Sequence, residues 1–510
     1  MLGEYSPVFY LNDDVTMRSI MSGAYTGTPD AHAVYMKYPL TYLLSLCYRL
    51  TDVVPWLEIF FYACTALCGW TLLYGIKAKK WNEKLLLIML TVFACVPLCF
   101  YMHYTIIAAL LAACGIWAYL LEQPKWQTVA CFVLAYAVRG QVFYVALPFL
   151  MVAALWKGRR YFLVRIKSIL WIVSIVMVIA LCHYMGYAGE WSTYRTFNDV
   201  RTELYDYTDF LSTNEYCKNP EVYGMTPLQG NVLNSYNLLL DDTIDTEFLA
   251  GVERKVVARM TEGRTLSKYF KMCIKSYYNY IRYDTMWEHM VLAVAYALLL
   301  MYACVSKQWK KIVLLFALGG GRSVIWLYLI WQGRFPQRVQ ETLLLVELLL
   351  VCGCLLMEEA SEKHKKIRSA ILICALVLLV GITGNKKLEN VKAVNDVQKQ
   401  WDVLVEYCEN HSEQTFLLDV FSVVAYSGRA FEKDASNMCM LGGWLAGSPI
   451  AIEKIAGASG PCLIVREDRE YLWMEESFRK KYGAGAFTPT PVEIKIDKTV
   501  FLVVEYEQAP

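Results

Sequence analysis

The stretch YTIIAALLAACGIWAYLL, residues 104–121, determines the fold class of this chain. It carries no charged side chain, and a helix of about 20 apolar residues crosses the hydrocarbon core of a bilayer. Similar runs occur at 55–76, 85–100, 168–185, 288–304, 312–331, 340–357 and 369–384, and 127–156 is apolar but interrupted by Arg139-Gly140-Gln141. The sequence therefore predicts an α-helical polytopic membrane protein with about nine or ten spans.

The composition agrees with this class and excludes others. Of the 510 residues, 57% are hydrophobic and 19% are charged, and the mean hydropathy is +0.34, which a soluble domain seldom reaches. The net charge is only +2, and the basic residues are spread over short loops rather than gathered in one patch. We therefore expect no nucleic-acid partner.

The positions of the basic residues predict the sidedness. Lysines and arginines cluster in the short segments 77–84, 157–167, 307–311 and 363–368. The positive-inside rule places all four in the cytoplasm. This requires 127–156 to cross twice, with Arg139 near the outer face. The N-terminal segment and the loops at 187–286 and 332–339 then lie outside, as does the tail after residue 385.

Five regions follow from this topology. We expect a first outer loop at 1–54, transmembrane bundles at 55–186 and 287–385, an extracytoplasmic helical insertion at 187–286 and an extracytoplasmic α/β domain at 386–510. The last assignment rests on short apolar runs that alternate with helical patterns: 415–420, 462–465, 492–496 and 500–506 against 392–410 and 468–481. No span precedes this outer loop in the sequence, so either the N-terminus crosses the membrane unaided or a first span lies upstream of Met1, and we expect the second.

Two adjacent carboxylates, Asp13 and Asp14, follow Asn12 in the first outer loop. One interpretation is a helix N-cap, because Asn and Asp accept hydrogen bonds from free amides at a helix start. The other is catalytic, because a weakly nucleophilic acceptor group needs a carboxylate base within hydrogen-bond reach. A second carboxylate would orient the first, or the two would hold a divalent cation such as Mg²⁺ or Mn²⁺.

Four arginines are candidates for binding an anionic substrate. Arg139, Arg334 and Arg338 are expected on the outer face, against the positive-inside trend, and a guanidinium group binds phosphate oxygens in a bidentate manner. Arg322 follows Gly319-Gly320-Gly321 in mid-span, where an unpaired charge is costly. It either forms an internal salt bridge to Glu341 or Glu347, or binds an anion.

His103 and Glu58 are further candidates for substrate binding. His103 lies at an outer span end, where it is either an ordinary interfacial histidine or a ligand. Glu58 lies in a span and either faces a cavity or pairs with a neighbour. The chain has no Walker motif, no Gly-Xaa-Ser-Xaa-Gly elbow and no His-Glu-Xaa-Xaa-His motif.

Taken together, these features resemble the GT-C superfamily of multi-span glycosyltransferases, which includes protein O-mannosyltransferases and aminoarabinose transferases. The resemblance rests on the outer acidic motif, the segment Tyr38-Pro39-Leu40 after it, the many short spans, the outer arginines and the C-terminal outer domain. It covers nearly the whole chain, but only the acidic motif is specific. It implies a polyprenyl-phosphate-linked sugar as donor, Asp13 or Asp14 as catalytic base, and Arg139, Arg334 and Arg338 around the lipid phosphate.

The resulting hypothesis is an inverting glycosyltransferase in a bacterial plasma membrane, with its active site facing outside. Its partners would be membrane lipid, the polyprenyl-phosphate-linked sugar and an acceptor glycan, lipid or protein. One alternative is a flippase or transporter of lipid-linked sugars, which would need broken helices that meet at mid-membrane. Another is an envelope-assembly protein without catalysis.

Overall fold

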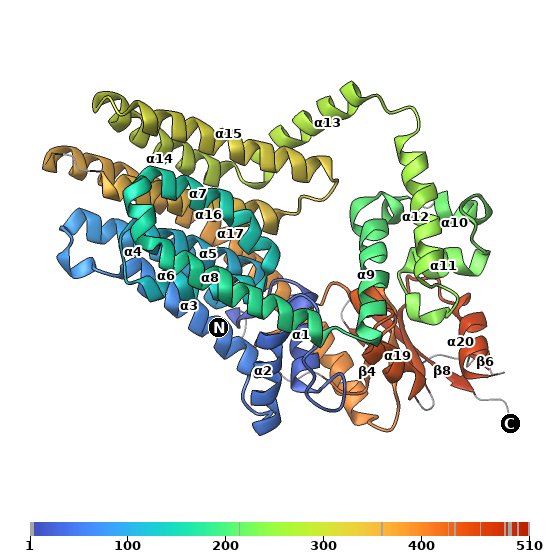
Figure 1. Cartoon of the computed structure of the whole chain (residues 1–510). Helices are drawn as coiled ribbons and strands as arrows, with labels where there is room; N and C mark the ends of the chain where they lie inside the picture. Colours follow the sequence, from blue (N-terminus) through green and yellow to red (C-terminus); the bar gives the residue numbers. More distant parts are fainter. Residues whose placement is uncertain are drawn as a thin grey trace.

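A computed structural model shows a bundle of long helices at one end and a smaller mixed domain at the other (Figure 1). It describes residues 5–213, 215–358, 361–426, 428–432, 435–458, 461–483, 486–487, 492–496 and 499–507. The expected fold class, a polytopic helical protein with a helical insertion and a C-terminal α/β part, is confirmed.

Eight of the described helices are long and apolar enough to cross a membrane. They are α3 (Trp56–Leu73), α4 (Trp81–Phe100), α7 (Gly140–Lys157), α8 (Arg159–Gly186), α14 (Met286–Val305), α15 (Trp309–Trp331), α16 (Gln337–Met357) and α17 (Glu362–Asn410). Two shorter apolar helices, α5 (Tyr104–Leu120) and α6 (Lys125–Val138), complete the bundle. The stretch 127–156 forms two helices, as a double crossing requires, because α6 ends just before Arg139 and α7 begins just after it.

The stretch that determines the fold class forms the centre of the bundle. Every residue of α5 is buried, and α5 packs against α3, α6, α7 and α16. By contrast, α8 and α15 keep large apolar side chains such as Trp171, Leu181 and Phe316 exposed. An apolar surface of this kind fits contact with lipid tails. The chain is therefore an integral membrane protein with a fully buried central helix.

The basic loops gather at one end of the bundle. Lys80 after α3 pairs with Glu362 at the start of α17 at 2.6 Å, and Lys311 in α15 pairs with Glu358 after α16 at 2.5 Å. The mixed domain and α1 (Asn12–Ser22) lie at the opposite end (Figure 1).

The helical insertion lies between α8 and α14. Its main helices are α9 (Glu190–Tyr207), α11 (Pro227–Ser235), α12 (Thr246–Thr261) and α13 (Leu266–Asn279). Asn237 fixes it to the C-terminal part, because its amide donates to Asp419 at 2.7 Å and its carbonyl accepts the Val420 N–H at 3.0 Å. This buried pair joins two regions that are far apart in the sequence.

The C-terminal part contains a mixed sheet. Strand β3 (Phe416–Leu418) is parallel to β4 (Met438–Met440) and to β5 (Cys462–Arg466), and β8 (Thr499–Glu507) is antiparallel to β5 and to β7 (Val492–Ile496). Helices α18 (Val420–Val423), α19 (Pro449–Ala456) and α20 (Met474–Tyr482) accompany the sheet. The four strands expected from the apolar runs, β3, β5, β7 and β8, are thus confirmed, and β4 and β6 (Ala486–Phe487) add to them. Helix α17 runs without a break past residue 385, where we expect the domain to begin.

A short parallel pairing brings the acidic segment to the centre of the molecule. Strand β1 (Val8–Phe9) pairs with β2 (Tyr101–Met102), which ends just before α5. Since α1 follows β1 directly, its first turn lies beside the start of the central helix. Helix α1 also packs against α2 (Tyr38–Leu50).

Candidate active site

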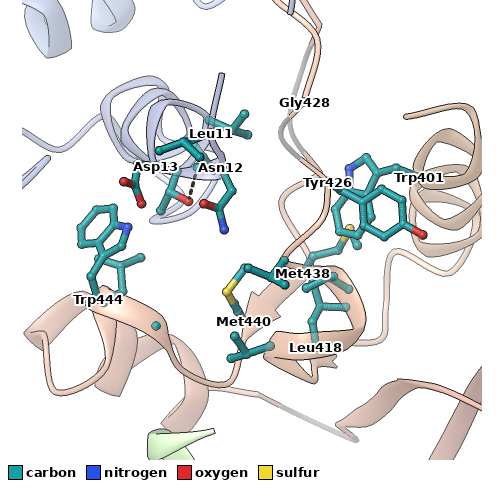
Figure 2. A pocket seen from close by; sticks show the side chains of 18 of the residues that line it. Leu11, Asn12, Asp13, Trp401, Leu418, Tyr426, Gly428, Met438, Met440 and Trp444 are labelled. Carbon is teal, nitrogen blue, oxygen red and sulfur yellow. Dashed lines mark hydrogen bonds between the residues drawn. The ribbon is translucent and has the colours of Figure 1, made fainter. Parts of the chain in front are cut away.

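A cavity of about 820 Å³ lies where the bundle meets the mixed domain (Figure 2). Its walls come from α1, α9, the start of α16, the last turns of α17 and the ends of β3 and β4. Figure 2 shows Asn12 and Asp13 on one side, with Trp444 close to Asp13 and with Met438, Met440 and Leu418 facing them. A volume of this order is typical of ligand pockets.

The two acidic residues point to different surroundings. Helix α1 begins at Asn12, so both carboxylates lie in its first turn. No side chain caps this helix. Asp13 is half-buried and lines the cavity. Asp14 is fully buried and accepts the backbone N–H of Tyr104 at 3.2 Å, which attaches α1 to α5. Of the predicted pair, only Asp13 is placed to meet a ligand.

The environment of Asp13 is electrostatically unusual. Burial raises the pKa of Asp13 above its ordinary value, although the guanidinium groups of Arg338, Arg139, Arg334 and Arg201 lower it. Burial also raises the pKa of Asp14 well above its ordinary value, which the Tyr104 N–H lowers and the charge of Asp13 raises further. A carboxyl group with a raised pKa beside several cations is typical of functional sites.

The predicted arginines at this end of the bundle surround Asp13. Arg334 and Arg338 both line the cavity, and Arg334 forms an ion pair with Asp206. Arg338 lies in the first turn of α16 and makes no ion pair with any residue that the structure describes. Arg139 packs its guanidinium over the rings of Tyr35 and Tyr104, at 5.0 and 5.2 Å from their centroids.

Two of these cations lack an anionic partner. In the described part of the chain, the buried Nη1 of Arg139 has no hydrogen-bond partner, and Arg338 has no carboxylate partner. Uncompensated guanidinium groups in a partly desolvated cavity are costly unless an anion binds there. The free amides in the first turn of α16, next to Arg338, favour the same kind of ligand.

Arg201 is a cavity residue that the sequence interpretation missed. It is 3% exposed, and it donates to Asn198 at 3.0 Å, to Thr202 at 2.8 Å and to the hydroxyl of Tyr236. It makes no ion pair with any described residue, although it lines the cavity. Its sequence signal is an arginine on the apolar face of α9, whose buried residues are Tyr194, Phe197, Arg201, Leu204 and Tyr205.

The C-terminal part holds Tyr236, a hydrogen-bond partner of Arg201, in place. Tyr236 has a positive φ of 64°, which is unusual for a residue with a side chain. Its carbonyl oxygen presses against Gly442, where a Cβ would lie 1.7 Å from it. Only glycine permits this close approach, so the Gly442-Gly443-Trp444 turn helps to orient the Tyr236 hydroxyl toward Arg201.

The remaining predicted residues lie outside the cavity wall. His103 is fully buried and caps α5, because its Nδ1 accepts the Thr105 N–H at 3.1 Å, and burial lowers its pKa well below the ordinary value. Glu58 is buried in an ion pair with Arg18 at 2.9 Å and accepts the Phe431 N–H at 3.2 Å. Both residues connect the acidic segment to neighbouring elements.

Arg322 lies within the bundle and is paired there. Its Nε lies 3.1 Å from a carboxylate oxygen of Glu347, and it also donates to the Tyr277 hydroxyl at 3.0 Å. The other oxygen of Glu347 accepts the Tyr296 hydroxyl at 2.6 Å. This is the internal salt bridge to Glu347 that the sequence offered as one of two interpretations.

The residues near Asp13 and Asp14 do not fit a shared cation. Asp13 lines the cavity and Asp14 does not, and the described residues contain no group of three or more His, Cys, Asp or Glu side chains that could hold a metal ion. In the described part of the chain, the site consists of the Asp13 carboxylate with arginines around it.

Comparison with known proteins gives one likeness in structure. The chain is similar to the crystal structure of ArnT from Cupriavidus metallidurans bound to undecaprenyl phosphate, with 11% sequence identity and a TM-score of 0.41, over 99% of this chain and 95% of that one. No family model and no curated protein matches the sequence. The function is therefore inferred from the cavity itself.

Proposed function

We propose that this chain is a membrane glycosyltransferase that moves a sugar from a polyprenyl-phosphate donor to an acceptor. The observation that carries the proposal is a cavity at the end of the bundle, with the raised-pKa carboxyl group of Asp13 among arginines, of which Arg338 and Arg201 form no ion pair with a described residue. The GT-C resemblance of the sequence implies the same chemistry. The proposal places the site on the outer face of a bacterial plasma membrane, because the basic loops lie at the other end.

The arginines suit the phosphate of the donor. The prenyl chain stays in the bilayer, so its phosphate lies at the membrane end of the cavity, where Arg338 begins α16. Arg338, Arg139 and Arg201 would supply charge-assisted hydrogen bonds to the phosphate oxygens. The same groups stabilise the negative charge that develops on the phosphate as the sugar leaves.

Asp13 suits the acceptor. Its carboxylate would take the proton of the acceptor hydroxyl or amine while that atom forms a bond to the anomeric carbon. The bond from the anomeric carbon to the phosphate oxygen breaks, and the polyprenyl phosphate leaves with the electron pair. Because the nucleophile attacks opposite to the leaving phosphate through an oxocarbenium-like state, the configuration inverts.

The transporter alternative is less well supported. A transporter needs a binding site near mid-membrane, where charged side chains bind the cargo or the coupling ion. In the described bundle, Arg322 and Glu347 lie at that depth, and they pair with each other. The cavity-lining arginines without a carboxylate partner among the described residues, Arg338 and Arg201, lie at the end of the bundle instead.

The decisive experiment incubates radiolabelled polyprenyl-phosphate sugar with membranes that contain the chain. We expect label to leave the donor, and we expect Asp13→Asn to slow transfer by about 10²–10⁴-fold because the base is lost. Asp199→Asn is the matched control, since Asp199 is exposed on α9 and should transfer at the wild-type rate. Transfer at the wild-type rate by Asp13→Asn would remove the proposal.

A further inference from the structure

The cavity has two chemically different ends. One contains Asp13 and the arginines already described. The other is formed by the last turns of α17 and by the ends of β3 and β4, with Trp401, Leu418, Tyr426, Met438 and Met440 (Figure 2). This second end, here called the sheet end, has no role in holding the donor phosphate.

The sheet end lies where ligands commonly bind in sheets of this kind. Strands β3 and β4 are parallel, and Leu418 and Met440 are their last residues. The segments after these strands also line the cavity, through Val420 and Gly442. In open α/β sheets, ligands bind outside the carboxyl ends of the parallel strands, which is the position of the sheet end.

The charge at the sheet end excludes a second phosphate. Asp402, Glu406 and Glu432 line it, and Arg429 pairs with Asp402 at 2.8 Å and with Glu432 at 2.9 Å. Glu406 is exposed and forms no ion pair with a described residue. The net negative charge repels an anionic group, whereas free carboxylate oxygens accept hydrogen bonds from hydroxyl groups.

An aromatic platform accompanies these carboxylates. The rings of Trp401 and Tyr426 stack with centroids 5.0 Å apart and planes 26° apart. The Tyr426 hydroxyl donates to Gln400 at 3.4 Å, which helps to hold the stack. Trp401 is only half-buried and lines the cavity, so part of its ring is available to a ligand. Aromatic rings with polar acceptors nearby suit a flat apolar surface edged by hydroxyl groups, as on a pyranose ring.

We propose that the sheet end is the acceptor subsite and that the acceptor is a glycan. Its terminal sugar ring packs against Trp401, and its hydroxyl groups donate to Glu406 and its neighbours. The statement that the bound sugar is the acceptor rests on the proposed function. Sugar binding at the sheet end, however, can be measured without any transfer. It selects one of the three acceptor classes that the sequence leaves open.

Saturation-transfer NMR on the full chain in lipid nanodiscs tests the proposal. The probes are a panel of soluble di- to hexasaccharides of neutral and amino sugars at millimolar concentration, with a panel of short peptides and a short-chain lipid as separate arms. We expect oligosaccharide signals from the wild type, and we expect Trp401→Ala to weaken them at least tenfold.

Three further variants separate binding from folding. Trp401→Phe keeps an aromatic ring and should retain most of the signal. Glu406→Gln changes an exposed side chain that the fold does not need, and it should weaken binding about threefold because a charged acceptor is lost. Trp309→Ala removes a tryptophan that is 71% exposed in the bundle, and it should change nothing.

Two results would overturn the proposal. One is the absence of oligosaccharide binding by the wild type, or binding that neither Trp401→Ala nor Glu406→Gln weakens. The other is retention of the peptides or the lipid in place of the sugars, with the same dependence on Trp401. If Asp13→Asn transferred sugar normally while Trp401 still controlled oligosaccharide binding, the proposed function would fail and the sugar subsite would stand.

Discussion

Arg322 and Arg338 lie on consecutive helices, but their surroundings are opposite. Arg322, inside the bundle, has Glu347 at 3.1 Å and the Tyr277 hydroxyl at 3.0 Å. Arg338, at the start of α16, makes no ion pair with a described residue and faces a cavity with Asp13. One arginine is neutralised by the protein, whereas the other has no carboxylate partner in the described part of the chain.

The difference separates stability from function within one chain. A buried cation must have an anion, because desolvation of an unpaired charge is costly. Where the protein supplies the anion, the pair fixes the packing of α15 against α16. Where no described carboxylate pairs with the cation, as at Arg338 and Arg201, an anionic substrate would offset the cost under the proposed function.

The largest expected effect comes from breaking the internal pair. Glu347→Gln keeps the shape of the side chain but leaves Arg322 without an anion in the bundle. We expect the free energy of unfolding in detergent micelles to fall by about 3–5 kcal/mol, as for other broken buried pairs. Glu476→Gln is the control, because its partner Lys480 is on an exposed helix surface and such pairs contribute at most about 1 kcal/mol.

The pH dependence of transfer gives a second, smaller test. Asp13 acts as a base only when ionised, and its pKa is raised, so transfer should fall by about tenfold per pH unit once the pH drops below that raised pKa. Arg338 lowers the pKa of Asp13, so Arg338→Gln should move the acid limb of the profile to higher pH. Arg322→Gln should leave the limb in place, and equal shifts in both variants would contradict the separation of roles.

Much of the fold was predictable from local sequence patterns. Long apolar runs predicted the spans, and short alternating runs predicted β3, β5, β7 and β8, because both patterns depend on residues close in the chain. The unbroken course of α17 was not predictable, because its apolar pattern ends near residue 384 while the helix continues to Asn410. Packing against the sheet, through residues such as Leu404 and Cys408, supports that polar extension.

The site was predictable only in part. Sidedness alone placed Asp13, Arg139, Arg334 and Arg338 at the same end of the molecule. The structure brings Asp13, Arg334 and Arg338 together around one cavity, and Arg139 lies near enough to lower the pKa of Asp13. Arg201 and the sheet end were not found, because they reach the cavity only through docking of the insertion and the C-terminal part. The Tyr236–Gly442 contact and the Asn237–Asp419 hydrogen bond that fix this docking join distant segments and leave no local pattern.

The most direct test of the central claim is the affinity of the purified full-length chain for a fluorescent polyprenyl phosphate. The wild type, Arg338→Gln and Arg322→Gln are compared in the same micelles, at a temperature where all three remain folded. The account predicts that Arg338→Gln weakens binding by about tenfold or more, since a charge-assisted contact to phosphate is lost, and that Arg322→Gln binds like the wild type. Equal affinity of Arg338→Gln and the wild type, or an equal loss in both variants, would contradict it.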